Sequence, residues 1–233
     1  LVYDFGQEIT GICRVTVKGE AGDVVTLRHG EWLNDESMRF TDGPVGSVWT
    51  RNLLGTQAVD RYILKGDEDG EVFEPGFVYH GFRYMEIIGL SESTEIVKVE
   101  GLVLSSDNER TGSYESSNEL VNKLYSNSVW SQIDNFISVP VDCPQRTERF
   151  GWSGDAQIYS HTASYTSNVL KFYSGYVQDL LDNQEDNGSV MDMSPFSGWV
   201  SGGNNGWGDA IVIIPWNMYQ QCGTTAIIEQ AYD

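Results

Sequence analysis

The sequence predicts a mixed fold in which the β and α parts are separate, with an N-terminal antiparallel β-sandwich followed by a helical region. Apolar and polar residues alternate with a period of two from residue 1 to about residue 115, which is typical of strands with one buried face. Beyond that point, apolar residues recur at helical spacing. No helical window interrupts the strand-like segments. We therefore expect a β-sandwich domain at 1–110 and a helical domain at 111–233.

Five segments carry the strand pattern, and residues that favour turns bound each of them. Short turns suit antiparallel neighbours, because parallel strands need a crossover of a dozen or more residues. Strands at this spacing without intervening helices favour a sandwich over a parallel α/β sheet. The segments are GICRVTVKGE, DVVTLRHGEW, QAVDRYILKG, FVYHGFRYMEIIG and EIVKVEGLVL, and the turn-forming clusters are KGEAGD, TDGPVG, KGDEDGE and GLSEST.

Two long helices are expected at the start of the helical region. Ser117 or Asn118 is placed to cap the first helix, because a side-chain oxygen at that position accepts a backbone N–H bond. The second helix is expected from about Ser153 to Leu181. The first carries Leu120, Leu124, Val129 and Ile133 near helical spacing, and the second carries Ile158, Thr162, Tyr165, Val169, Phe172 and Tyr176.

Two further helices are expected toward the end of the sequence. NNGWGDAIVIIPWNMYQQCG predicts a helix that begins near Trp207 and ends at Gly223, bent or interrupted at Pro215. TTAIIEQAYD predicts the start of another. Amphipathic helices joined by long loops expose apolar faces unless they pack on the sandwich, on more chain or on another copy. We expect further helices to be that partner, and the lack of an initiator methionine suggests a longer protein.

The composition favours a neutral polar ligand and excludes polyanions. The chain has 34 acidic and 14 basic side chains and a formal net charge of -20, so it repels nucleic acid and anionic membranes. Seven Trp, 12 Tyr and 9 Phe supply flat apolar faces that cover the C–H surface of a sugar, while carboxylates accept its hydroxyls. An acidic surface also serves solubility alone, so composition by itself does not establish sugar binding.

Cysteine, histidine and hydropathy patterns predict no metal, no cofactor and no membrane span. Cys13, Cys143 and Cys222 are widely spaced without a CxxC pair, so they imply neither a disulfide framework nor a zinc site. His29 and His161 have no second histidine at metal-ligand spacing. No apolar run approaches the roughly 20 residues that span a bilayer. The chain begins without the basic residues of a signal peptide. The sequence leaves both a cytoplasmic and a secreted location open. It also leaves the oligomeric state open.

The stretch Val139–Gln157 gathers carboxylates, arginines and a tryptophan in one loop-like segment. Pro140 and Pro144 restrict its backbone, so its side chains lose little entropy on binding. Carboxylates that lie close together, or beside an indole, favour the protonated form of one of them, as a general acid requires. The group consists of Asp142, Arg146, Glu148, Arg149, Trp152 and Asp155.

A purely structural role fits the same residues. Arg146 and Arg149 can form ion pairs with Asp142 and Glu148 that stabilise the loop conformation. Trp152 can pack at the start of the following helix and hold it in place. Residue types alone leave both interpretations open.

The stretch DCPQRTERFGWSGDAQ and four further stretches, in family order, resemble the bacterial and fungal α-L-rhamnosidases of glycoside hydrolase family 78. DCPQRTERFGWSGDAQ resembles their catalytic-domain motif. VYDFGQEITGICRVTVKGEAGDVVTLRHGE and FEPGFVYHGFRYMEIIG resemble the β-sandwich before the catalytic barrel, while GSYESSNELVNKLYSNSVWSQIDNFISVPVDCPQR and NGWGDAIVIIPW resemble the first barrel helices. The resemblance implies an inverting glycoside hydrolase, with residues 111–233 forming the N-terminal part of a truncated (α/α)6 barrel.

The resemblance also implies which residues act on the sugar. Glu148 would be the general acid that protonates the glycosidic oxygen. An inverting enzyme needs a base on the opposite face of the sugar, roughly 6.5–9.5 Å from the acid. In the family this base is a glutamate from much later in the barrel. We therefore expect the chain to carry the acid but not the base, and to hydrolyse rhamnosides poorly or not at all by itself.

The same resemblance implies the substrate-binding residues. Asp142, Arg146 and Asp155 would hold the ring hydroxyls of rhamnose. Trp152 and Trp207 would form the sides of the rhamnose subsite. One of the two indole rings would contact the C5 methyl group of the sugar. A 6-deoxy sugar favours an apolar wall, and its hydroxyls favour charged hydrogen-bond partners. The expected partner is a rhamnose-containing glycoside or oligosaccharide.

Several other polar residues have ordinary structural interpretations. Asp209 fits either the sugar site or a favourable charge at a helix N-terminus. Asp134 and Asn135 are expected to form an exposed polar end of the first helix. His80 is expected to pack between strand aromatics.

Two alternative functions stay open. The β-sandwich by itself fits a carbohydrate-binding module, in which exposed aromatics on strands would bind the sugar. The same barrel also fits a glycosidase with another sugar specificity, although the negative net charge disfavours a uronic acid.

Overall fold

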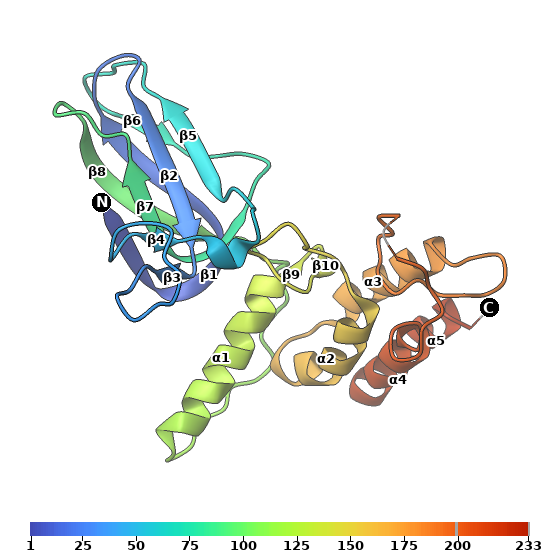
Figure 1. The fold of residues 1–233 in the computed structure, drawn as a ribbon. Helices are drawn as coiled ribbons and strands as arrows, with labels where there is room; N and C mark the ends of the chain where they lie inside the picture. The colour runs from blue at the N-terminus through green and yellow to red at the C-terminus, as the bar shows by residue number, and fades with distance from the viewer. Residues whose placement is uncertain (199, 233) are drawn as a thin grey trace. The chain divides into compact units, whose positions relative to one another are not determined.

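The computed structural model describes residues 1–198 and 200–232, which divide into two compact units (Figure 1). The β unit comprises Leu1–Leu104 together with Cys143–Thr147. The helical unit comprises Ser105–Asp142 and the chain from Glu148 onward.

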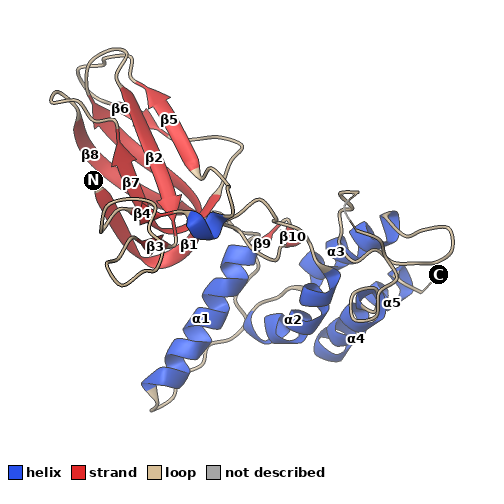
Figure 2. Ribbon diagram, viewed as in Figure 1, coloured by secondary structure: helices blue, strands red, loops and turns tan. Residues whose placement is uncertain are grey.

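The β unit is built on an antiparallel sheet, as the period-two pattern predicts (Figure 2). Among the described residues, six strands form one sheet in the order β5-β2-β7-β1-β6, with β8 also paired to β1, and β3 pairs with β4 in a separate ribbon. The strands are β1 (Val2–Lys18), β2 (Val24–Gly30), β3 (Trp32–Leu33), β4 (Val48–Trp49), β5 (Val59–Ile63), β6 (Glu71–Phe73), β7 (His80–Ile88) and β8 (Glu95–Val103), and a 3-10 turn, η1, spans Arg51–Leu53.

Strand β1 holds the sheet together because it has different partners along its length. Its first part pairs with β7 as far as Gly11, and the part from Gly11 onward pairs with β8. A side chain at Gly11 would put a Cβ 1.9 Å from the carbonyl oxygen of Leu102, so this crossing requires glycine. On one face, Leu27 of β2 lies opposite Ile87 of β7, and both are buried.

A buried cluster of His29, Asp60 and His80 lies inside the β unit. The two imidazole rings stack with centroids 4.2 Å apart and planes 17° apart, and His80 Nε2 lies 3.0 Å from Asp60 Oδ2. His80 is therefore buried against another ring, as predicted, although that ring is a histidine. A metal bound by both histidines would need the ring planes to converge on it, because the nitrogen lone pairs lie in those planes. The nearly parallel rings favour a hydrogen-bonded core cluster over a metal site.

Acidification is expected to destabilise the β unit through His29. Burial lowers the pKa of His29 to about 3, and the neighbouring His80 contributes to this lowering. An unfolded histidine has a pKa near 6.5, so between these two values the unfolded chain binds more protons than the folded chain. Stability is therefore full above the unfolded pKa and falls by roughly 1.4 kcal/mol per pH unit as the pH decreases through this window.

Urea unfolding between pH 7 and 4.5 measures this effect in wild type, His29→Gln and His161→Gln. We expect His29→Gln to be less stable at pH 7 but to lose less stability on acidification. His161 is exposed on a helix, so its replacement should leave the pH dependence unchanged. An unaltered pH dependence in His29→Gln would show that another group is responsible.

The helical unit contains five described helices and a short ribbon. They are α1 (Glu119–Asn135), α2 (Ser153–Thr166), α3 (Leu170–Asp182), α4 (Ala210–Cys222) and α5 (Ala226–Gln230), with β9 (Phe136–Ile137) paired to β10 (Val139–Pro140). None of the described helices is both long and apolar enough to cross a membrane.

Local signals place the ends of two of these helices correctly. The Asn118 side chain accepts a 3.0 Å hydrogen bond from the Leu120 amide, so Asn118 is the N-cap of α1. Helix α4 ends at Gly223, which adopts the left-handed conformation with φ of 69°. Pro215 lies inside α4 without ending it.

The single helix expected from Ser153 to Leu181 is wrong, because this segment forms α2 and α3. Ser167 ends α2 in an extended conformation and forms an antiparallel bridge with Arg110. The Asn168 amide then donates a 2.8 Å hydrogen bond to the Glu109 carbonyl. The segment at Glu109 and Arg110 thus pairs with backbone groups that a continuous helix would bond internally. The hydrophobic periodicity of residues 153–181 cannot reveal this pairing.

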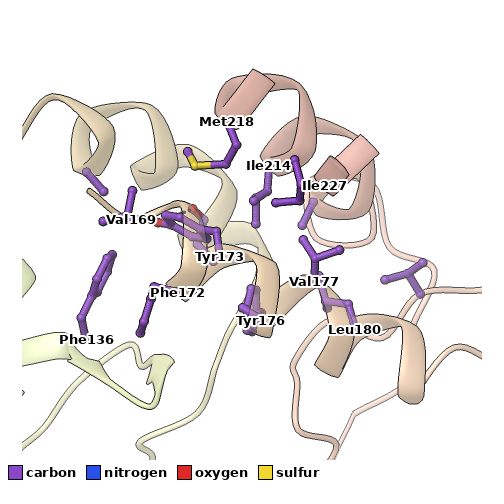
Figure 3. Close-up of a cluster of buried hydrophobic side chains, with 14 residues drawn as sticks. Phe136, Val169, Phe172, Tyr173, Tyr176, Val177, Leu180, Ile214, Met218 and Ile227 are labelled. Carbon is purple, nitrogen blue, oxygen red and sulfur yellow. Dashed lines mark hydrogen bonds between the residues drawn. The ribbon is translucent and has the colours of Figure 1, made fainter. Parts of the chain in front are cut away.

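The core of the helical unit is centred on α3 (Figure 3). Tyr173 and Val177 of α3 face Ile214 of α4 and Ile227 of α5, and all four are essentially buried. By contrast, some apolar residues of the two preceding helices are exposed within this chain. Leu120 of α1 and Ile158 of α2 are each 80% exposed.

Candidate functional site

The predicted catalytic loop is closed by a pair of hydrogen bonds within the helical unit. The Asp142 amide donates to the Phe150 carbonyl at 2.9 Å, and the Phe150 amide donates to Asp142 Oδ1 at 2.8 Å. Asp142 therefore uses one carboxylate oxygen to hold the loop. Next to this closure, Arg149 adopts a left-handed conformation with φ of 51°. The loop thus has a defined backbone, as its prolines predict.

Glu148 and Trp152 form a hydrogen-bonded pair. The indole Nε1 of Trp152 lies 3.0 Å from Glu148 Oε1 and donates to it. Both side chains are partly buried, and the ring of Phe150 meets that of Trp152 edge to face at 6.5 Å. A carboxylate oxygen of Glu148 also lies within 4.8 Å of one of Asp142. The carboxyl group of Glu148 therefore has a fixed position beside an indole and a second carboxylate.

A distant segment fixes the backbone on which Trp152 stands. Trp152 forms an antiparallel bridge with Met193, and the carbonyl of Gly151 accepts a 2.9 Å hydrogen bond from the Ser194 amide. The Tyr176 hydroxyl donates to the same carbonyl at 2.8 Å. A Cβ at residue 151 would lie 2.2 Å from the Ser194 carbonyl oxygen, so this approach requires glycine. The orientation of Trp152 thus depends on contacts that sequence spacing did not predict.

A cavity of about 550 Å³ opens in the helical unit, and Asp142, Asp155 and Trp207 line it, whereas Glu148 and Trp152 are not among its lining residues. Asp155 lies in the first turn of α2, and Trp207 precedes α4. A Cβ at Gly154 would approach the indole nitrogen of Trp207 to 3.0 Å, so Gly154 makes room for this ring. The structure therefore brings these three predicted substrate-binding residues to one cavity.

The cavity also includes polar residues that sequence reasoning missed, namely Asn135 and Gln157. The Gln157 amide group donates a hydrogen bond to the Gly206 carbonyl, which ties α2 to the loop that carries Trp207. The Asn135 amide group donates to the Ser131 carbonyl at 2.8 Å. Gln157 follows Asp155 by two residues in the recognised motif, and this proximity was the available signal for it.

The expectation that Asp134 and Asn135 form an exposed helix end is wrong. Asp134 is 5% exposed, and Asn135 is half-buried. The chain continues directly from α1 into the β9–β10 ribbon, and the Val141 amide donates a 2.9 Å hydrogen bond to the Asn135 carbonyl. This return of the chain covers the helix end.

Arg146 lies in the β unit, whereas the other predicted site residues lie in the helical unit.

Asp209, for which two roles were open, is exposed before α4 and accepts a 2.9 Å hydrogen bond from the Gly206 amide. This contact gives Asp209 a structural role in the loop that precedes α4.

The chain matches two consecutive family domains. Residues 1–105 match the bacterial α-L-rhamnosidase concanavalin-like domain, and residues 109–233 match the bacterial α-L-rhamnosidase 6 hairpin glycosidase domain. An α-L-rhamnosidase of Streptomyces avermitilis is 40% identical over 230 residues, which are 99% of this chain and 21% of that protein. One of Formosa agariphila is 37% identical over 237 residues, covering 100% of this chain and 24% of the relative.

Solved structures give the same result. The α-L-rhamnosidase of Streptomyces avermitilis complexed with L-rhamnose matches with a TM-score of 0.89 and 39% identity, over 99% of this chain and 21% of that one. The enzyme of Dictyoglumus thermophilum matches with a TM-score of 0.90 and 38% identity, over 99% of this chain and 25% of that one. The chain therefore spans about a fifth to a quarter of these relatives. The predicted resemblance is confirmed, and the chain belongs to the bacterial α-L-rhamnosidase family.

Proposed function

We propose that the complete protein carrying this chain is an inverting glycoside hydrolase that removes terminal α-L-rhamnose from glycosides or oligosaccharides. Family membership, the Glu148–Trp152 pair and the cavity lined by Asp142, Asp155 and Trp207 support this proposal. In the complete protein, residues 1–110 would form a β-sandwich domain. Residues 111–233 would supply the first helices of an (α/α)6 barrel. Hydrolysis by two carboxyl groups requires neither a metal nor another cofactor.

In this proposal Glu148 protonates the leaving glycosidic oxygen. The indole of Trp152 holds one oxygen of Glu148 at 3.0 Å, so the carboxyl group would meet the substrate in a defined orientation. The catalytic base would come from outside residues 1–233, as the family resemblance implies. The chain alone would then bind rhamnose without hydrolysing rhamnosides efficiently.

The other motif residues would bind the sugar ring. Asp142 and Asp155, which line the cavity, would accept hydrogen bonds from ring hydroxyls, and Arg146 would donate to them. Trp152 and Trp207 would present apolar ring faces to the sugar, including its C5 methyl group. The Streptomyces avermitilis relative was solved in complex with L-rhamnose, which supports rhamnose as the sugar to test here.

A carbohydrate-binding module is the second candidate function. It is favoured by Trp32 on β3, which is 60% exposed and offers a ring face within the β unit. In that case the strand aromatic would bind sugar, and the charged loop would serve the fold.

A titration with L-rhamnose separates these two functions. In the complete protein, we expect Trp152→Ala to weaken L-rhamnose binding about tenfold or more, because it removes a ring face and a fixed hydrogen-bond donor. Trp32→Ala, the matched control, should bind with unchanged affinity. Isothermal titration calorimetry gives both dissociation constants. Loss of binding in Trp32→Ala alone would instead support the binding module.

A further inference from the structure

Two carboxamide side chains that line the cavity of the helical unit have a fixed orientation. The Asn135 amide nitrogen donates a 2.8 Å hydrogen bond to the Ser131 carbonyl. The Gln157 amide nitrogen donates to the Gly206 carbonyl. A backbone carbonyl can only accept a hydrogen bond, so in both side chains the nitrogen must face the backbone and the oxygen must face away from it. Each amide oxygen is therefore left as an acceptor for another partner.

Neither of these amide oxygens accepts a hydrogen bond within the described parts of the chain. Gln157 is only 6% exposed and Asn135 is half-buried, so the two oxygens are largely withdrawn from bulk solvent. An enclosed acceptor that lacks a donor destabilises the protein, and a donor that reaches it removes this cost. Both residues line the cavity, so a ligand bound in it can supply the donor.

Two carboxylates add further acceptors to the same cavity. Asp142 and Asp155 line it, and an ionised carboxylate accepts hydrogen bonds but donates none. The chain keeps Asn135 near Asp142, because the Val141 amide donates a 2.9 Å hydrogen bond to the Asn135 carbonyl. Gln157 follows Asp155 by two residues. A ligand that matches four acceptors must donate several hydrogen bonds, whereas an anion would be repelled by the carboxylates.

Apolar side chains supply the rest of the cavity lining. Trp207 lines the cavity and directly follows Gly206, whose carbonyl the Gln157 side chain holds. Phe136 and Ile158 also line it. A sugar ring has apolar C–H groups on its faces and hydroxyls at its edge, so a ring that lies against an indole directs its hydroxyls sideways. The cavity thus combines apolar surface with acceptors, which suits a neutral polyhydroxyl ring.

We infer that Asn135 and Gln157 are specificity-determining residues of the sugar site: their amide oxygens accept hydrogen bonds from hydroxyls of the bound sugar. This inference rests on the proposed function, in which rhamnose occupies the cavity. It adds a requirement for free hydroxyls to that function, because a sugar with fluorine in place of a hydroxyl has no proton to donate at that position.

Calorimetric titration of the complete protein with L-rhamnose and its 2-, 3- and 4-deoxyfluoro analogues tests the inference. Fluorine is close to a hydroxyl in size but cannot donate a hydrogen bond. We expect wild type to bind at least one analogue about tenfold more weakly than L-rhamnose. Gln157→Ala and Asn135→Ala should each weaken L-rhamnose binding about tenfold. Each variant should bind the analogue that lacks its partner hydroxyl with less than about twofold further loss, since the hydroxyl and the amide act as a pair.

Gln184→Ala is the matched control. Gln184 is exposed, and its amide nitrogen donates a 3.0 Å hydrogen bond to the Gly188 carbonyl, so it makes the same kind of backbone contact outside the cavity. This variant should bind L-rhamnose and the analogues as wild type does. Gln157→Ala also releases the loop before Trp207, but a displaced indole would weaken the binding of L-rhamnose and of every analogue equally. Asn135→Ala leaves the contact of that loop in place.

The possible outcomes distinguish this inference from the proposed function. If wild type binds L-rhamnose but the side-chain and fluorine substitutions act independently, or the side-chain substitutions have no effect, the inference fails and the proposed function stands. Wild type could instead bind another neutral sugar, such as L-fucose or D-mannose, and show the same coupling with its deoxyfluoro analogues. The proposed function would then fail and the acceptor site would stand. Absence of binding of all these sugars to wild type would overturn both.

Discussion

Replacing Glu148 with glutamine is expected to lower kcat/KM of the complete protein roughly 10²–10⁴-fold on rhamnosides with poor leaving groups. Glutamine keeps the size of the side chain, and its carbonyl oxygen can still accept the hydrogen bond from the Trp152 indole. It has no acidic proton, so the leaving oxygen must depart without protonation. Because the sugar-binding residues are untouched, the dissociation constant of L-rhamnose should change little.

Glu109→Gln is the matched control for this change. Glu109 is exposed in the same unit, and its backbone carbonyl, which the substitution leaves in place, accepts a 2.8 Å hydrogen bond from the Asn168 amide. Steady-state kinetics on an alkyl α-L-rhamnoside should show near wild-type turnover for this variant. Comparable losses in both variants would indicate a general loss of charge or folding and not the loss of a proton donor.

Replacing Gly151 with alanine is expected to destabilise the helical unit by more than about 3 kcal/mol. The added Cβ would lie 2.2 Å from the Ser194 carbonyl oxygen and 3.2 Å from the ring of Tyr176. The backbone atom cannot move without breaking the hydrogen bond between Ser194 and Gly151 and the bridge at Trp152. The variant should therefore also lose L-rhamnose binding where it remains folded.

Gly175→Ala provides the control for this substitution. Gly175 lies on the exposed face of α3, and no atom lies within 4 Å of a Cβ built there. Because alanine favours a helix more than glycine does, this variant should be more stable by about 0.5–1 kcal/mol. Urea unfolding of wild type and both variants measures the two differences. A Gly151→Ala protein as stable as wild type would show that the Gly151–Ser194 approach is not tight.

The features that local physics determines were predictable from the sequence. The antiparallel sheet follows from period-two alternation and short turns, and five of its six strands overlap the predicted segments, whereas β6 was not predicted. Asn118 caps α1 because its side-chain oxygen reaches the first turn. Gly223 ends α4 because glycine adopts the left-handed conformation readily. Each of these signals lies within a few residues of the feature it predicts.

Features that depend on distant contacts were not predictable in this way. The break between α2 and α3 follows from the pairing of Ser167 with Arg110, and the burial of Asp134 follows from the chain's return after α1. Pairwise spacing of histidines could not reveal that His29 and His80 stack in the folded sheet.

The candidate site likewise combines features that were predictable from the sequence with features that only the structure shows. Family resemblance selected Asp142, Asp155 and Trp207, and the structure places all three at one cavity. The roles of these residues stay predictions. The motif is one continuous stretch of sequence, but the structure assigns Arg146 to the β unit and Glu148 to the helical unit. Geometry thus adds the supporting contacts that a motif does not contain.

The most direct test of Glu148 as the proton donor is the dependence of the Glu148→Gln defect on the leaving group. Protonation matters most when the leaving oxygen is basic and least when it departs readily as an anion. The measurement is kcat/KM of wild type and Glu148→Gln on an alkyl α-L-rhamnoside and on a 2,4-dinitrophenyl α-L-rhamnoside. We predict a defect at least about tenfold larger on the alkyl substrate. Equal defects on the two substrates would contradict the assignment of Glu148 as the proton donor.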